Sequence, residues 1–113
     1  MGESLEEFPQ PMLNPDQSWV VAIGGDLRKI DVIRDFWQVV IEIIDDTPPA
    51  LWINFSTVCY ADTKLAACII AIMRRAEEQG VEMYIVGSSA VQDMLKLCKV
   101  PPLKCFTQIN KAA

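Results

Sequence analysis

The sequence lacks several residues and motifs on which enzymes and metal sites commonly depend. It contains no histidine, which is the commonest general base and the commonest metal ligand. Its four cysteines form no CxxC pair, so the usual zinc and redox motifs are missing. It has neither a GxGxxG nor a Walker phosphate-binding loop. We therefore expect no catalytic residues, no metal site and no cofactor.

Positive charge is also scarce. Ten lysines and arginines stand against fifteen aspartates and glutamates, which gives a formal net charge of −5. The basic residues are scattered, with Arg28–Lys29 and Arg74–Arg75 as the adjacent pairs, whereas binding to nucleic acid or anionic lipid requires basic patches. The longest purely apolar stretch, residues 65–73, is far shorter than the roughly 20 residues that cross a bilayer. We expect a soluble protein with no nucleic-acid partner and no direct membrane insertion.

The N-terminal residues and the cysteines indicate the compartment. The first eighteen residues are polar and rich in proline, unlike a secretory signal. Cys68 and Cys98 fall at apolar positions of predicted helices, so we expect them to pack as small hydrophobic residues. Cys59 precedes a predicted helix, a position that activates thiols, but no histidine can act as its base. We therefore expect a packed thiol there, and free thiols throughout a cytoplasmic protein.

The chain does contain an alternation of apolar strands and amphipathic helices. Runs of large and β-branched residues predict strands at 19–23, 51–55 and 81–86. A short last strand is expected at 104–109, and an edge strand near Met12 and Leu13. Such alternation gives a largely parallel sheet with helices packed on it. We predict an α/β fold with a mixed β-sheet. An extended N-terminal arm is expected over residues 1–17 and a single domain over residues 18–109.

Three helices are predicted between and after these strands. The first ends before the prolines at 48–49. Asp62 is a good N-cap for the second, which ends at Gly80. Ser88 or Ser89 caps the third. The residues expected to face the core are Ile30, Ile33, Trp37, Val40, Ile41 and Ile44 in the first helix, Leu65, Cys68, Ile69, Ile72 and Ala76 in the second, and Val91, Met94, Leu95 and Cys98 in the third.

Three further groups of residues have ordinary structural explanations. Residues 24–26, Gly-Gly-Asp, follow a predicted strand, and we expect a strand-to-helix turn with a positive φ rather than a phosphate loop. The acidic pair at 45–46 is expected to be a solvated helix end rather than a metal pair or a catalytic dyad. Trp52 and Tyr60 are expected to be packing residues rather than a ligand cage.

The segment of residues 57–64, Thr-Val-Cys-Tyr-Ala-Asp-Thr-Lys, leads from a predicted strand into a capped helix. This junction places Asp62 and Thr63 at an exposed corner, beside the positive end of a helix dipole. On these residues alone, the favoured interpretation is that Asp62 caps the helix and that Thr63 is an ordinary residue of its first turn.

Taken in order, these segments resemble a STAS domain. Residues 51–56, Leu-Trp-Ile-Asn-Phe-Ser, resemble the family's strand "vvlDlsgv", with Asn54 where Asp is usual. Asp62 and Thr63 stand at the Asp-Ser pair of "iDSsGl", and the helix and strand that follow keep the family's order. Residues 25–27, Gly-Asp-Leu, are similar to the "G-x-L" before the family's first helix. The resemblance covers about residues 19–106 and implies a STAS-like mixed sheet with helices packed against it.

The resemblance also implies a function in bacterial signalling and transcription regulation. Single-domain STAS proteins of this size resemble anti-sigma-factor antagonists, which are protein-interaction modules and not enzymes. There a partner serine/threonine kinase, the anti-sigma factor, phosphorylates the hydroxyl residue at the Thr63 position and thereby switches binding off. The implied partner-binding residues are Asp26, Asp62, Thr63, Lys64 and Ala67.

Two other roles stay open within this family. An Asp-Thr pair at this site is common in small cytoplasmic STAS subunits of lipid-transport ABC complexes, where the partners are an ATPase and a permease. A STAS domain that binds a small ligand, a nucleotide or a lipid, is the third alternative.

Lys64 and Leu65 replace the family's small residue and its Gly, and we expect Leu65 to fill the space through which a partner approaches. Self-association into a homodimer stays open as well.

Overall fold

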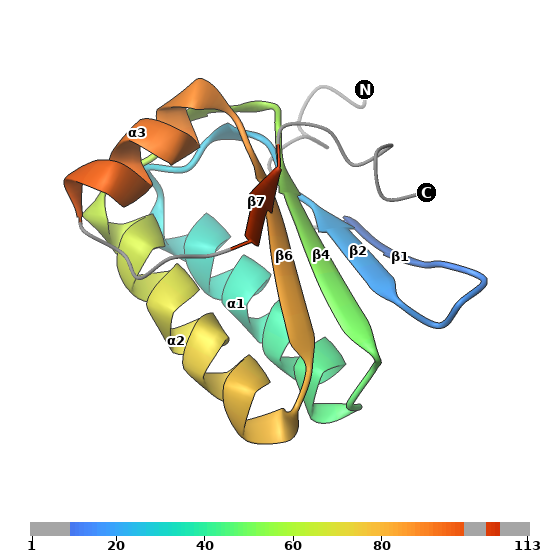
Figure 1. The fold of residues 1–113 in the computed structure, drawn as a ribbon. Helices are drawn as coiled ribbons and strands as arrows, with labels where there is room; N and C mark the ends of the chain where they lie inside the picture. The colour runs from blue at the N-terminus through green and yellow to red at the C-terminus, as the bar shows by residue number, and fades with distance from the viewer. Residues whose placement is uncertain (1–9, 99–103, 107–113) are drawn as a thin grey trace.

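The fold is centred on a five-stranded sheet (Figure 1). The computed structural model describes residues 10–98 and 104–106. β1 is antiparallel to β2, and the other neighbouring strands are parallel, which confirms the predicted mixed α/β sheet. Residues 107–109 of the last predicted strand lie outside the described residues. In sheet order, the strands are β1 (Gln10–Leu13), β2 (Trp19–Ala22), β4 (Ala50–Phe55), β6 (Glu82–Gly87) and β7 (Lys104–Phe106).

β4 forms the middle of the sheet, and its side chains alternate in burial. Leu51, Ile53 and Phe55 are fully buried, whereas the residues between them are partly exposed. Ile53 lies between Val21 of β2 and Ile85 of β6 in the register of the sheet, and both neighbours are fully buried too. Parallel neighbours in register present their side chains to the same face, so these residues form a continuous apolar layer under the helices.

Two long helices, α1 (Ile30–Asp45) and α2 (Thr63–Gln79), lie side by side on one face of the sheet (Figure 1). α2 agrees with the prediction at both ends. Asp62 is its N-cap, and Gly80 ends it in the left-handed conformation with a φ of 72°. The predicted inner face is confirmed as well, because all five of its residues are buried: Leu65, Cys68, Ile69, Ile72 and Ala76.

The inner face of α1 is partly different from the prediction. Trp37 and Ile30 were expected in the core but are 39% and 55% exposed, whereas Phe36 and Ile43 are buried. α1 carries apolar residues around more than half of its circumference, so helical periodicity does not select one face. Phe36 occupies the core because its ring reaches Phe55 of β4, with the ring centroids 5.5 Å apart. The correctly predicted core positions of α1 are Ile33, Val40 and Ile44.

The third helix, α3 (Ser89–Leu97), lies beyond the N-terminal end of α2 (Figure 1). Ser88 is its N-cap and accepts a hydrogen bond from the Val91 backbone N–H at 3.3 Å. The Gln92 side chain donates to the Gly87 carbonyl at 2.9 Å and ties the helix back to β6. Val91 and Met94 are buried as predicted. The other two predicted core positions, Leu95 and Cys98, are only partly buried.

A second, two-stranded sheet connects the loops that precede α1 and α2. β3 (Gly25–Asp26) pairs in parallel with β5 (Val58–Tyr60). Gly25 has a φ of 83°, which confirms the predicted turn with a positive φ. Sequence patterns did not indicate these strands, because two or three residues are too few to show a period. Their pairing fixes two loops that are far apart in the sequence against each other.

β1 lies in the region that we expected to be extended. It contains Met12 and Leu13, at which a short edge strand was predicted. Leu13 pairs with Trp19 and Pro11 with Val21. The division into an arm of residues 1–17 and a domain of residues 18–109 stays a prediction. Within the part of the chain that the structure describes, no helix has the length and apolar character needed to cross a bilayer.

The cysteine side chains that the structure describes are free thiols. Cys68 is buried, and this burial raises the pKa of its thiol to about 12. Cys98, the C-cap residue of α3, is partly buried. Cys59 is exposed, so the expectation of a packed thiol there was wrong. It follows the buried Val58 in β5, and alternation along the strand turns its side chain towards solvent.

Candidate functional site

The first turn of α2 follows the carboxyl end of β4, at the edge of a parallel sheet where ligands and partners usually bind. The chain turns as soon as it leaves β4, because the Asn54 side-chain oxygen accepts a hydrogen bond from the Ser56 backbone N–H at 2.9 Å. It then passes through β5 and enters α2 at Thr63. Asn54 therefore shapes the turn that leads to the site.

Asp62 and Lys64 form a compact charged pair at the start of α2. Asp62 Oδ1 accepts the Lys64 backbone N–H at 2.9 Å, and Asp62 Oδ2 lies 2.7 Å from Lys64 Nζ. The hydrogen bond from the Lys64 side chain is the main reason why the pKa of Asp62 lies below its ordinary value. A lysine in the first turn of a helix faces the positive end of the dipole. Its partner Asp62 offsets that repulsion.

Thr63 lies between these two residues and is exposed. It is the first residue of α2, and its hydroxyl forms no hydrogen bond with the described residues. Ala67 lies one turn further along the same helix and is exposed as well. Leu65 does not fill the approach to the site, contrary to expectation, because its side chain is fully buried in the core. The small Ala67 and the buried Leu65 together leave the surface beside Thr63 open.

Asp26 borders the same corner through the pairing of β3 with β5. It pairs with Tyr60, two residues before the cap of α2. The Asp26 carboxylate binds the Arg28 side chain at 2.9 Å, and Arg28 lies over the Tyr60 ring at 4.6 Å from its centroid. Leu27 adds a backbone hydrogen bond to the Tyr60 carbonyl at 3.1 Å. Asp26 is thus held by a cation that also covers an aromatic ring.

A cleft separates this corner from α3. It has a volume of about 340 Å³, and Ala61, Asp62 and Thr63 line one side. The residues that line the other side come from α3 and its end: Ala90, Asp93, Met94, Leu97 and Cys98. Leu97 is 82% exposed, the exposed apolar side chain that a protein-binding surface commonly presents.

The structure brings the predicted partner-binding residues into one region. Asp62, Thr63, Lys64 and Ala67 share the start of α2, and Asp26 joins them through β3. Sequence reasoning missed Arg28 and the α3 side of the cleft, because their place depends on tertiary contacts. It also treated Tyr60 as a packing residue, although the ring is 38% exposed and bears the Arg28 cation. Leu97, the last residue of the amphipathic α3, was the one local signal available.

The chemistry of this corner suits recognition. It combines an exposed hydroxyl, the positive end of a helix dipole, an ion pair and an apolar cleft. In residues 10–98 and 104–106, no three acidic, cysteine or histidine side chains gather in a group that could hold a metal ion. The acidic pair Asp45 and Asp46 lies at the end of α1, where Asp45 binds Arg75 of α2 at 2.8 Å.

Comparison with known proteins finds solved structures with a similar fold. No family model and no curated protein matches the sequence. A solved candidate anti-sigma factor antagonist from Thermotoga maritima has a TM-score of 0.79 at 17% identity, over 92% of this chain and 90% of that one. The anti-sigma factor antagonist SpoIIAA in its unphosphorylated form has a TM-score of 0.73 at 14% identity, over 92% and 91%. An anti-sigma-factor antagonist (STAS) domain protein from Planctomyces limnophilus has a TM-score of 0.71 at 10% identity, over 92% and 93%.

Proposed function

We propose that this chain, which has the STAS fold, is a protein-interaction module of the anti-sigma-factor antagonist type. One observation carries the proposal. The Thr63 hydroxyl is exposed and free of partners among the described residues, at the first position of a helix whose inner face is locked in the core. The proposed partner contacts Asp26, Asp62, Thr63, Lys64 and Ala67, and the proposed regulation is phosphorylation of Thr63.

A phosphate on Thr63 would act locally. It adds about −1.5 to −2 charges and three acceptor oxygens. The dipole at the start of α2 favours an anion there, and Lys64 stands next to it. Asp62 repels the same charge, and Lys64 can turn from Asp62 to the phosphate. The domain therefore stays folded, and the partner meets the added bulk and charge.

The first test measures folding and binding of the same variants. We expect Thr63→Glu to leave the free energy of unfolding within about 1 kcal/mol of the wild type, measured by urea denaturation. Ser89→Glu, at the exposed first position of α3, is the matched control for an added anion at a helix start. Thr63→Glu should weaken binding of the purified partner at least about tenfold, which is roughly 1.4 kcal/mol. Thr63→Ala should bind but resist switching by the kinase.

Thr47→Glu is the binding control, because Thr47 is exposed between α1 and β4, at the opposite end of β4 from the site. It should bind like the wild type. If the partner binds the wild type, Thr63→Glu and Thr63→Ala equally, Thr63 is a neighbour of the helix cap and the switch is refuted. Tandem mass spectrometry of protein from its native cells should locate the phosphate on Thr63 and find none in Thr63→Ala.

The partner recovered decides between this function and its alternatives. A soluble serine/threonine kinase retained from native lysate supports the antagonist function. An ATPase and permease that stay together with the chain support a subunit of a lipid-transport ABC complex. A nucleotide or lipid seen by native mass spectrometry supports a ligand-binding STAS domain. Each outcome excludes the other two as the main role.

A further inference from the structure

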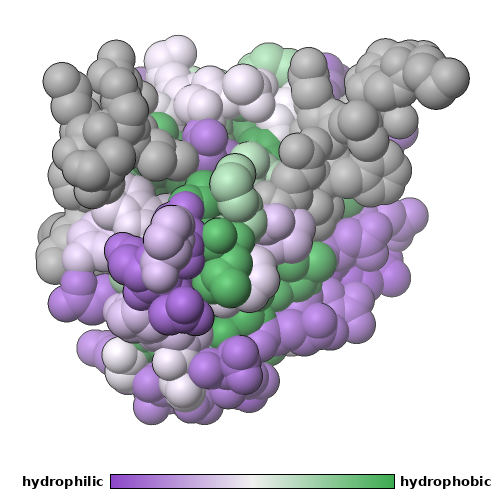
Figure 2. Space-filling view, turned by 90° about the vertical axis from the view of Figure 1, so that its right-hand side faces the viewer, coloured by the Kyte–Doolittle hydropathy of each residue, from purple (hydrophilic) through white to green (hydrophobic). Residues whose placement is uncertain are grey.

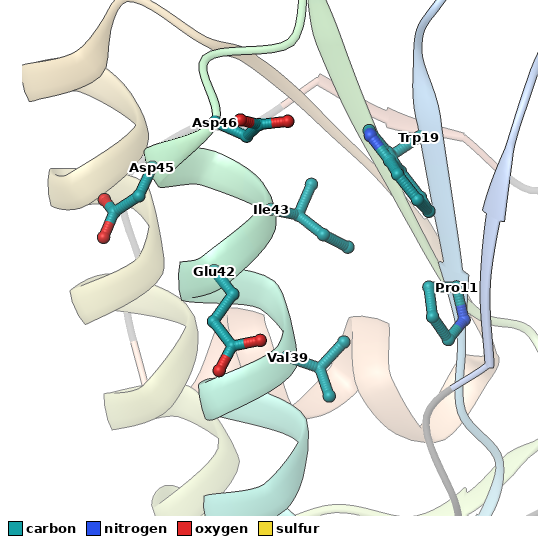
Figure 3. A pocket seen from close by; sticks show the side chains of 7 residues that line it. All are labelled: Pro11, Trp19, Val39, Glu42, Ile43, Asp45 and Asp46. Carbon is teal, nitrogen blue, oxygen red and sulfur yellow. The ribbon is translucent and has the colours of Figure 1, made fainter.

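A second surface lies at the other side of the molecule, where α1 leaves part of the sheet uncovered. A groove of about 460 Å³ runs between α1 and the edge formed by β1 and β2. Figure 3 shows Val39 and Ile43 of α1 facing Trp19 of β2 and Pro11 of β1 across it. Figure 2, which views this side of the molecule, shows a hydrophobic strip between hydrophilic borders. Leu13, which pairs with Trp19 and is 49% exposed, extends the apolar surface along β1.

The rim of this groove is acidic. Glu42 and Asp46 are exposed on its α1 side and form no ion pair with the described residues. Asp46 is the C-cap of α1, where the negative end of the helix dipole adds to its charge. Asp45 contributes less, because it binds Arg75 of α2 at 2.8 Å and its side chain points away from the groove (Figure 3).

We propose that this groove binds a basic amphipathic helix of a protein partner, laid beside α1 as a third helix on the sheet. The uncovered strip of sheet flanks a helix that already lies on the same face, and helices pack against such neighbours at about 8–10 Å. The partner would place large apolar side chains at helical spacing on Trp19, Val39 and Ile43. Lysine or arginine side chains on its flank would face Glu42 and Asp46.

Charge argues against two other occupants. Among the described residues, the groove lining contains no lysine or arginine, so a second copy docked groove to groove offers no positive charge to Glu42 and Asp46. Residues 1–9 of this chain carry three glutamates and neither lysine nor arginine, so their side chains offer no positive charge to the rim either. The groove is also independent of the proposed function, since none of its lining residues belongs to the corner around Thr63.

The test titrates the full ¹⁵N-labelled chain with a synthetic helical peptide that carries leucine on one face and lysine on the other. The control peptide keeps the leucines and replaces every lysine with glutamate. We expect the basic peptide to shift the NMR signals of the Trp19 indole and of the Val39 and Ile43 amides, and the acidic peptide to shift none. The double variant Glu42→Lys, Asp46→Lys should weaken binding of the basic peptide about tenfold.

Matched variants separate the groove from general electrostatics. Glu77→Lys with Glu78→Lys changes the net charge equally on the exposed end of α2 and should leave binding within about twofold. Val39→Ser should weaken binding, whereas Gln38→Ser, on the exposed side of α1, should not. Thr63→Glu should bind the peptide as tightly as the wild type. A negative result for the proposed Thr63 switch would therefore not affect the proposal for the groove.

Three outcomes would overturn the proposal. Equal loss of peptide binding in the Glu42→Lys, Asp46→Lys variant and in the Glu77→Lys, Glu78→Lys variant would show that net charge, and not the groove, attracts the peptide. Shifts confined to the corner around Thr63 would place the peptide elsewhere. A dimer in sedimentation equilibrium that Val39→Ser dissociates would show that a second copy occupies the groove.

Discussion

At the scale of single residues, Asp62 makes two contacts that define the start of α2. Its two carboxylate oxygens have separate partners, the backbone N–H and the side-chain ammonium of Lys64. The first contact caps α2, and the second holds the lysine next to Thr63. Capping and ion pairing are therefore separable by substitution, because asparagine can cap but carries no charge.

We predict that Asp62→Ala lowers the free energy of unfolding by about 1 kcal/mol, because the first turn of α2 loses its cap. Asp62→Asn should lose only a few tenths of that, since an exposed ion pair contributes little. Urea denaturation at neutral pH measures both. Equal losses for the two variants would mean that the ion pair, and not the cap, stabilises this turn.

The thiols of Cys59 and Cys68 differ in accessibility, and a second residue-scale prediction follows. Iodoacetamide at neutral pH should label Cys59 in the folded protein, because it is exposed. Cys68 should stay unlabelled until the protein is unfolded, because it is buried and its thiol has a raised pKa of about 12. Peptide mass spectrometry with and without denaturant gives the two rates. Similar rates in the folded protein would contradict the buried position of Cys68.

At the scale of elements, the two long helices differ in how far their sequences determine them. Local chemistry sets both ends of α2, since Asp62 caps it and Gly80 supplies the left-handed residue that ends it. Its inner face is less determined by the sequence, because residues 65–73 are all apolar. α1 has apolar residues on both flanks, so contact with Phe55 decides which of Phe36 and Trp37 is buried.

The same distinction explains which parts of the site were predictable. Asp62 and Thr63 follow from a cap signal within a few residues. Arg28 and the cleft wall from α3 depend on the pairing of β3 with β5 and on how α3 lies against α2. Such contacts between distant segments leave no local pattern, and the exposure of Cys59 was misjudged for the same reason.

Gly80 allows a test at this scale. We predict that Gly80→Ala lowers the free energy of unfolding by about 1 kcal/mol, because alanine is strained at a φ of 72°. No atom lies within 4 Å of the position that a Cβ would take, so the cost comes from the backbone alone. Gly80→Asn should cost less, since asparagine tolerates this conformation. Thermal or urea unfolding measures both, and a larger loss for asparagine would contradict this account.

At the scale of the whole molecule, the absence of histidine shapes the response to pH. No side chain with an ordinary pKa near neutrality is present. Among the described residues, Asp16, Asp45 and Asp62 have pKa values below the ordinary 3.8, caused mainly by hydrogen bonds from Ser18, Arg75 and Lys64 respectively. Their stabilising contribution is present above that ordinary value and is lost as the pH falls through the lowered pKa.

We therefore predict stability that is nearly constant between about pH 5 and pH 8 and falls below about pH 4. A second fall is expected at high pH, because Cys68 keeps its proton in the folded state up to a pKa of about 12 and in the unfolded state only to about 9.0. Urea midpoints across this range measure both. Cys68→Ala should flatten the alkaline fall, and a transition near pH 6.5 in the wild type would contradict the prediction.

The burial of α2 affects how quickly the proposed switch could respond. Leu65, Ile69 and Ile72 of α2 are fully buried, so the helix is anchored in the core along its length. In the proposed switch, a phosphate on Thr63 would change the charge and bulk of an exposed surface directly, without requiring α2 to move. The response time would then be set by the enzymes that add and remove the phosphate and by the dissociation rate of the partner.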